Sequence, residues 1–187
     1  MKKIAFGLAA FALSAAAFAQ NIYVGGAVGQ ARYDFDCSGS SSCDKNDTGA
    51  KVFGGYKFTP NIAVEASYAN FGKAKFGVPV PGFGVVNGDL KGEGFGAGVA
   101  FFAPFGNDFS GVARLGVASN KFKLSASGFG ASASQSETNT EATYGLGVSY
   151  NLTKQVSIDL AWDGTRGKFQ GDTVKVNMFT LGATYSF

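Results

Sequence analysis

Six charged residues are the first candidates for chemistry in this sequence, because each falls on the small-residue side of a segment in which residue character alternates. They are Lys51, Lys57, Glu65, Arg114, Asp159 and Asp163. Three are basic and three acidic, so opposite partners in a narrow interior would offset the cost of burying charge. The balance favours an ion-pair plug over a selective ion pathway, since selective pores usually carry rings of one sign.

Cys37 and Cys43 lie six positions apart in a polar, Ser-rich stretch. In an oxidising compartment this spacing favours a disulfide that closes a small loop. A reactive or metal-binding thiol pair is the alternative, although thiolate metal sites usually recruit more than two ligands. The acidic residues around the loop are Asp34, Asp36, Asp44 and Asp47. They could hold Ca²⁺, but the EF-hand spacing is missing, and a solvated loop without metal is favoured.

The chain of 187 residues contains no His. This excludes an imidazole base, a Ser/His/Asp relay and a His-ligated metal. We therefore predict that the protein is not an enzyme and has no cofactor.

The N-terminus has the features of a secretory signal peptide. Lys2 and Lys3 precede an apolar run, and Ala17-Phe18-Ala19 fits the cleavage pattern, which predicts a signal at 1–19 and a mature barrel domain at 20–187. Without the signal, 14 basic residues stand against 13 acidic ones. This near-neutral balance gives no indication of a nucleic-acid partner.

Eight segments of the mature chain alternate with the period of two that is typical of strands. They run near 21–33, 49–58, 61–71, 92–103, 109–121, 139–152, 155–166 and 174–187. One face of each is apolar and uncharged, aromatic residues cluster at segment ends, and the other face is small or polar, with many of the 28 glycines. Such a pattern predicts an all-β fold: an eight-stranded antiparallel transmembrane up-and-down β-barrel with a narrow interior and interfacial aromatic girdles.

The connections between these segments alternate in length. Those near 58–61, 103–108 and 151–154 are short, whereas the longer ones are 34–48, 72–91, 122–138 and 167–173. Bacterial outer-membrane barrels have short periplasmic turns and long outside loops. The alternation therefore predicts that both termini lie on the periplasmic side.

Two stretches resemble a known family. FGGYKFTPNIAVEASYANFG at 53–72 resembles the second hairpin of the OmpA-type transmembrane domain, and TLGATYSF at 180–187 resembles the last strand of outer-membrane barrels. The resemblance places the chain with the small OmpA-like and OmpX/Ail-like barrels of the Gram-negative outer membrane, in contact with its lipid. It implies that Phe187 and Tyr185 form the signal read by the barrel assembly machinery.

The resemblance also shows two departures. Asp159 stands where the family is expected to have a basic residue in the lumen. The ion-pair network around Glu65 must therefore have a different arrangement of partners. The resemblance covers the barrel alone, so we do not carry over cell-wall tethering through a peptidoglycan-binding domain.

The outside connections contain apolar residues that could contact a partner. They are Phe76, Val78, Val80, Phe83, Phe122 and Phe129. Such residues can mark a host or matrix binding surface, or they can extend the strands and pack on one another. The sequence therefore predicts a structural outer-membrane barrel with loops that serve adhesion or host interaction. The alternative is a narrow channel for ions or small solutes. Membrane-enzyme families of this architecture rely on a His that this chain lacks.

Overall fold

Residues 21–34, 40–80, 84–128, 131–169 and 172–187 are described in the computed structural model. They form nine strands in a single antiparallel sheet. The strands are β1 (Ile22–Asp34), β2 (Ser42–Asp44), β3 (Asn46–Thr59), β4 (Ile62–Val80), β5 (Gly84–Phe105), β6 (Phe109–Gly128), β7 (Ala131–Asn151), β8 (Val156–Phe169) and β9 (Asp172–Ser186). The predicted signal at 1–19 and Cys37 lie outside these residues.

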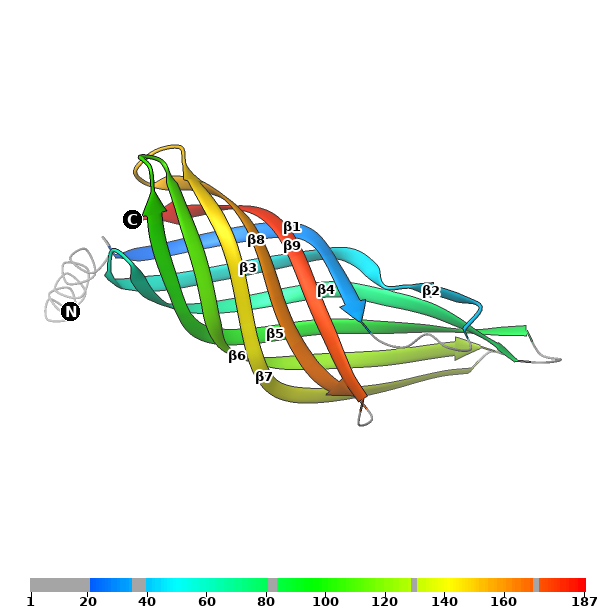
Figure 1. Ribbon diagram of the computed structural model, residues 1–187. Helices are drawn as coiled ribbons and strands as arrows, with labels where there is room; N and C mark the ends of the chain where they lie inside the picture. The colour runs from blue at the N-terminus through cyan, green and yellow to red at the C-terminus, as the bar shows by residue number, and fades with distance from the viewer. Residues whose placement is uncertain (1–20, 35–39, 81–83, 129–130, 170–171) are drawn as a thin grey trace, which may run out of the picture.

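The eight long strands close into a ring (Figure 1). Each pairs with its neighbours along the chain, β1 pairs with β9, and a β4–β5 pairing completes the ring. The predicted eight-stranded antiparallel barrel is confirmed. The sequence did not reveal β2, a three-residue strand that pairs with Lys75–Gly77 of β4.

Alternation along every long strand gives the barrel an apolar exterior, because successive side chains point to opposite faces of a strand. Val28 remains 61% exposed on the outside and Leu115 60%, whereas Ala27 and Val112 on the inward faces are buried. An exterior of exposed Val, Leu and Phe is the surface that lipid covers. Among the described residues, no helix is long and apolar enough to span a membrane.

The two ends of the barrel differ. The turn end has the short connections 60–61, 106–108 and 152–155, with the start of β1 and the end of β9 beside them (Figure 1). Aromatic rings gather there: Phe105 stacks on Phe109, which in turn contacts Tyr150. The opposite end, the hairpin end, carries the connections that the sequence predicted to be long.

Those connections are mostly strand, so the predicted strand boundaries at the hairpin end are wrong. β4 and β5 pair from Ile62–Phe101 to Val80–Gly84, interrupted only by a bulge between Asn70 and Lys73. β6 and β7 pair without a break from Phe109–Tyr150 to Gly128–Ala131. The ladder continues because backbone hydrogen bonds need a partner strand and do not depend on apolar side chains.

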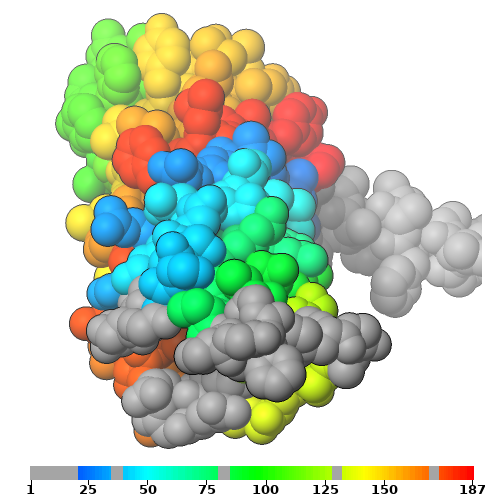
Figure 2. Space-filling view, turned by 90° about the vertical axis from the view of Figure 1, so that its right-hand side faces the viewer, coloured from blue at the N-terminus to red at the C-terminus, as the bar shows by residue number. Residues whose placement is uncertain are grey.

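The longer hairpins form a wall that we call the outer sheet, comprising β4 from Lys73, β5 to Glu93, β6 from Lys121 and β7 to Ala142. The β7–β8 pairing begins only at Thr143–Thr165, so the outer sheet stands beyond the shorter β8–β9 hairpin (Figure 1). In the view onto the hairpin end, the cyan residues near β2 lie against the green residues of β4 and β5 (Figure 2). The outer sheet is therefore the main projecting part of the described chain.

An apolar cluster fills the barrel interior at the hairpin end. Its buried members are Ala31, Tyr33, Phe71, Ala74, Leu90, Phe122, Val174, Val176 and Met178. The hydroxyl of Tyr33 donates to the carbonyl of Gly72 (3.0 Å) and accepts from the amide of Gly92 (2.9 Å). This hairpin-end cluster packs the lumen on the side away from the turns.

Candidate functional site

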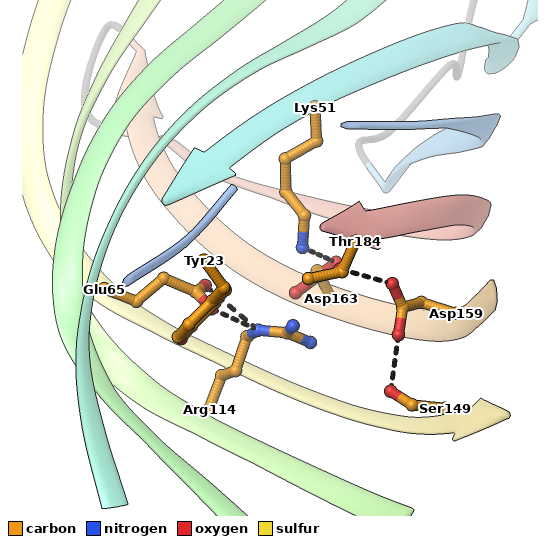
Figure 3. A network of polar contacts seen from close by, with 8 residues as sticks. All are labelled: Tyr23, Lys51, Glu65, Arg114, Ser149, Asp159, Asp163 and Thr184. Atoms are coloured by element: carbon orange, nitrogen blue, oxygen red, sulfur yellow. Dashed lines mark hydrogen bonds and ion pairs between the residues drawn. The ribbon is translucent and has the colours of Figure 1, made fainter. Parts of the chain in front are cut away.

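The charged lumen is built from inward positions of four strands, β3, β4, β6 and β8, and all six predicted residues lie on that face. Two ion pairs cross it (Figure 3): Lys51 Nζ lies 2.5 Å from Asp163 Oδ2, and Arg114 Nε lies 3.0 Å from Glu65 Oε1. These contacts join β3 with β8 and β6 with β4, across the barrel. The predicted pairing of opposite charges is therefore present for four of the six residues.

The Glu65–Arg114 pair has further partners that a buried pair needs. Arg114 Nε also donates to Glu65 Oε2 (3.1 Å), and the Tyr23 hydroxyl donates to the same oxygen (3.0 Å). The guanidinium lies 5.1 Å from the centre of the Phe53 ring. Tyr23 and Phe53 were not among the predicted site residues, although their inward positions on β1 and β3 follow from the alternation.

Asp159 and Lys57 form no ion pair within the part of the chain that the structure describes. Asp159, 8% exposed, accepts hydrogen bonds from the hydroxyls of Ser149 (2.5 Å), Thr184 (2.5 Å) and Ser157 (3.4 Å). Lys57 Nζ lies 4.9 Å from the centre of the Phe102 ring. The balanced charges therefore do not all pair, because alternation assigns residues to the lumen but not to positions facing each other across it.

Two small cavities lie in the lumen, and Arg114 lines both. Each has a volume of about 60 Å³, room for a few water molecules. Asn120 lines the cavity nearer the hairpin end and is fully buried. Its amide nitrogen donates to the Thr165 hydroxyl (2.8 Å), whereas its amide oxygen has no hydrogen-bond partner among the described residues.

The aspartates near the predicted disulfide bind backbone amides. Asp44 Oδ1 accepts from the amide of Asn46 (3.1 Å), and Asp47 accepts from the amides of Thr48 (2.8 Å) and Lys73 (2.7 Å). Within the described ranges, no three His, Cys, Asp or Glu residues gather into a group that could hold a metal ion. Asp36 lies outside those ranges with Cys37, so the disulfide stays a prediction.

The predicted apolar contacts of the outside loops differ in their placement. Val78 is 41% exposed on β4, Phe76 is half-buried, and Val80 is the last residue of β4. Phe83 and Phe129 lie outside the described residues. Phe122 is fully buried in the hairpin-end cluster. The prediction of an exposed contact is therefore wrong for Phe122. The strand β6 continues past the predicted segment end, and the Phe122 side chain lies on its inward face.

A row of lysines on the outer sheet was missed by sequence reasoning. Lys73 of β4 stands opposite Lys91 of β5, which stands opposite Lys123 of β6. Lys73 and Lys123 are exposed and Lys91 partly so. Two long contacts with carboxylates flank the row, Lys73–Asp89 at 3.9 Å and Lys91–Glu93 at 3.7 Å. Only the strand register brings these three residues together, since 18 and 32 positions separate them along the chain.

The C-terminal aromatic residues lie on the outside of the barrel at the turn end. The rings of Tyr185 and Phe187 meet edge to face with centres 5.0 Å apart. The amide of Phe187 donates to the carbonyl of Ile22 (3.0 Å), which helps to close β9 onto β1.

Comparisons with known proteins agree with this architecture. The outer membrane protein beta-barrel domain family matches residues 4–187. The attachment invasion locus protein of Yersinia pseudotuberculosis is 32% identical over 145 residues, 77% of this chain and 74% of the relative. Outer membrane protein A of Shigella flexneri is 27% identical over 194 residues, 98% of this chain and 54% of the relative. The chain thus spans about half the length of that second relative.

Solved structures give the same result. The crystal structure of Ail, the attachment invasion locus protein of Yersinia pestis, superposes with a TM-score of 0.60 at 27% identity, covering 90% of this chain and 99% of Ail. Ail in complex with the heparin analogue sucrose octasulfate gives a TM-score of 0.57 at 26% identity, covering 89% and 99%. The family resemblance predicted from the hairpin and the C-terminal strand is confirmed.

Proposed function

Because the chain belongs to the outer membrane protein beta-barrel domain family, we propose that it is a closed surface barrel that attaches to anionic polysaccharide through its outer sheet. The protein is located in the outer membrane of a Gram-negative bacterium, as its relatives are. In that membrane the turn end faces the periplasm and the hairpin end faces outward.

The lysine row carries this proposal. Like charges directly opposite one another on a sheet destabilise it, and here three lysines stand in succession across β4, β5 and β6. The flanking carboxylates are too distant and too exposed to compensate fully, because surface ion pairs contribute little. A polymer with regularly spaced sulfate or carboxylate groups would neutralise all three at once. Adhesion to such a polymer is consistent with the crystal structure of Yersinia pestis Ail with a sulfated heparin analogue.

The proposal treats the barrel as an anchor that supports membrane structure. Two ion pairs, a packed apolar cluster and cavities of about 60 Å³ support a plugged lumen over the alternative of a narrow channel. A non-enzymatic role belongs to the same proposal, since the chain has no His to serve the relay of membrane-enzyme relatives.

Three further parts of the proposal concern biogenesis. Residues 1–19 direct export, and Cys37 and Cys43 form a disulfide between β1 and β3. The barrel assembly machinery recognises the C-terminal end of the chain through Tyr185 in β9 and Phe187 directly after it. The outward, exposed placement of those two aromatic rings supports recognition before the strand is surrounded by lipid.

The test is heparin binding by the refolded mature protein in nanodiscs. We expect the triple variant Lys73→Gln, Lys91→Gln, Lys123→Gln to bind about tenfold more weakly, since three ionic contacts of about 0.5 kcal/mol each are lost. The affinity of the unmodified protein should also fall as salt is raised, because exposed charges are screened.

The matched control removes three charges from the opposite wall: Arg32→Gln, Arg166→Gln and Lys175→Gln. These residues are exposed on β1, β8 and β9, with Arg166 directly opposite Lys175. Retained binding in this control supports the lysine row as the site. An equal loss in both triple variants would mean that only net charge matters, and it would overturn the proposal.

A further inference from the structure

Three charged residues, Lys57, Arg114 and Asp159, line the cavity at the turn end, and Arg114 is already paired with Glu65. Lys57 and Asp159 both line it, yet neither forms an ion pair with any residue that the structure describes. The cavity lies at the turn end because Asn151 and Ser186, which also line it, are the last residues of β7 and β9.

On the acidic side of this cavity, the carboxylate of Asp159 is held in place and can accept a further hydrogen bond. Asp159 is buried and fixed by Ser149 and Thr184, whose hydroxyls each donate to a different carboxylate oxygen at 2.5 Å. A carboxylate has about four acceptor positions, and the three hydroxyl hydrogen bonds occupy at most three of them. A buried carboxylate without a cation is costly, so an incoming ammonium group would be stabilised there.

On the basic side of the cavity, the ammonium group of Lys57 lacks a hydrogen-bond acceptor among the described residues. Lys57 Nζ lies 4.9 Å from the Phe102 ring centre and 5.6 Å from that of Tyr23, and its ammonium protons have no acceptor among the described residues. The rings stabilise the cation in part and keep it within the cavity. A carboxylate would supply the missing acceptor and a charge-assisted hydrogen bond.

We propose that this cavity binds a small zwitterion, with its carboxylate at Lys57 and its ammonium at Asp159. The smallest α-amino acids are the chemical class that fits, because a volume of about 60 Å³ accommodates roughly four to six non-hydrogen atoms. A ligand carrying a single charge would satisfy one side and leave the other uncompensated.

The same geometry makes the cavity a blind pocket. Arg114 and Phe53 line its inner end, and beyond them lie the Lys51–Asp163 pair and the hairpin-end cluster. The cavity lies at the turn end, which faces the periplasm. Binding therefore needs no passage through the lumen, and the inference stands apart from adhesion at the outer sheet.

Titration of the isotope-labelled mature protein in nanodiscs, followed by NMR, tests the proposal. Glycine is the probe, and acetate, methylammonium and leucine are the comparison ligands. We expect glycine to shift the amide signals of Asp159 and its neighbours saturably. Acetate and methylammonium should bind at least tenfold more weakly, and leucine should be excluded by its size.

Single substitutions test whether Lys57 and Asp159 bind the two charged groups of glycine. Lys57→Gln and Asp159→Asn should each weaken glycine binding at least tenfold, whereas Lys154→Gln, an exposed lysine in a turn at the same end, should leave it unchanged. Should Asp159→Asn fail to fold, Lys57→Gln decides alone, because Lys57 donates no side-chain hydrogen bond within the described chain. Equal binding of glycine and acetate, unchanged binding by Lys57→Gln, or no saturable shift at millimolar glycine would each overturn the proposal.

Discussion

At the scale of single residues, partners in the lumen are chosen by position along the barrel axis as well as by charge. Glu65 reaches Arg114 and Tyr23, and Lys51 reaches Asp163. Asp159 instead lies directly opposite Ser149 in the β7–β8 register and takes hydroxyl partners. Asp159 thus occupies a position where the resemblance implies a basic residue, and neutral donors stabilise its anion without neutralising it.

Glu65→Ala tests one of the two buried ion pairs in the lumen. We expect the free energy of unfolding to fall by about 3–5 kcal/mol, because Arg114 would keep a buried charge without its partner. Urea unfolding of the refolded barrel measures this change. The control, Glu93→Ala, removes a partly exposed carboxylate 3.7 Å from Lys91 and should cost less than about 1 kcal/mol. A large, stable channel in planar bilayers with unchanged stability of Glu65→Ala would contradict the plug.

At the scale of elements, the strands serve two purposes along one continuous ladder. Within the apolar band they present lipid-facing side chains, and beyond it β4 to β7 continue as the outer sheet. The inward positions are small or form ion pairs in the middle of the barrel, and they belong to the hairpin-end cluster at the hairpin end. Close approach of neighbouring strands is possible where glycine leaves space for backbone atoms.

Gly29→Ala should weaken the closure of β1 onto β9. A Cβ at Gly29 would clash with the carbonyl oxygen of Phe179, a backbone atom that cannot move aside by rotation. We expect a loss of about 1–3 kcal/mol in unfolding experiments. Gly26→Ala on the same strand is the matched control, because the nearest atom to its Cβ is 4.0 Å away, and it should change stability by less than about 0.5 kcal/mol. Equal effects of both variants would show that this strand contact does not limit stability.

Phe122→Ala separates packing from partner contact. Because Phe122 is fully buried, its truncation should lower the free energy of unfolding by about 3–5 kcal/mol. Val85→Ala, on an exposed part of β5, should stay within about 0.5 kcal/mol. Loss of ligand binding by Phe122→Ala at unchanged stability would mean that Phe122 contacts the ligand directly.

At the scale of the whole molecule, the protein is a closed barrel with an asymmetric hairpin end and an interior that leaves small cavities. The outer sheet projects on one side and the β8–β9 hairpin is shorter on the other (Figure 1). Both lumen cavities are small, and Arg114 lines both of them. This construction suits an anchor that presents a surface outside the membrane.

Single-channel recording of the refolded mature protein tests the filled interior. We expect no stable conducting steps in planar bilayers, because the ion pairs and the hairpin-end cluster occupy the lumen in succession. The heat-dependent shift in gel mobility that marks a folded barrel verifies that the inserted protein is folded. Uniform, long-lived conductance steps from such folded protein would favour the channel alternative.

Much of this architecture was predictable from local pattern. The eight lipid-crossing segments, the apolar exterior and the lumen face of Lys51, Glu65, Arg114 and Asp163 all follow from a period of two. The ends of the strands could not be predicted in this way. The exposed positions of the outer sheet are polar residues such as Lys121 and Lys123, which are also common in loops. The strand β2 could not be predicted, because a segment of three residues is too short to show an alternation of residue character.

The sequence by itself determined the barrel, because lipid on one side and a narrow lumen on the other impose a strict alternation on every strand. Only the tertiary structure decided which lumen charges meet, that Phe122 is buried, and that Lys73, Lys91 and Lys123 form a row. The physical reason is strand register. Alternation assigns a side chain to a face, whereas pairing between strands sets its height and neighbours, and those neighbours come from distant parts of the chain.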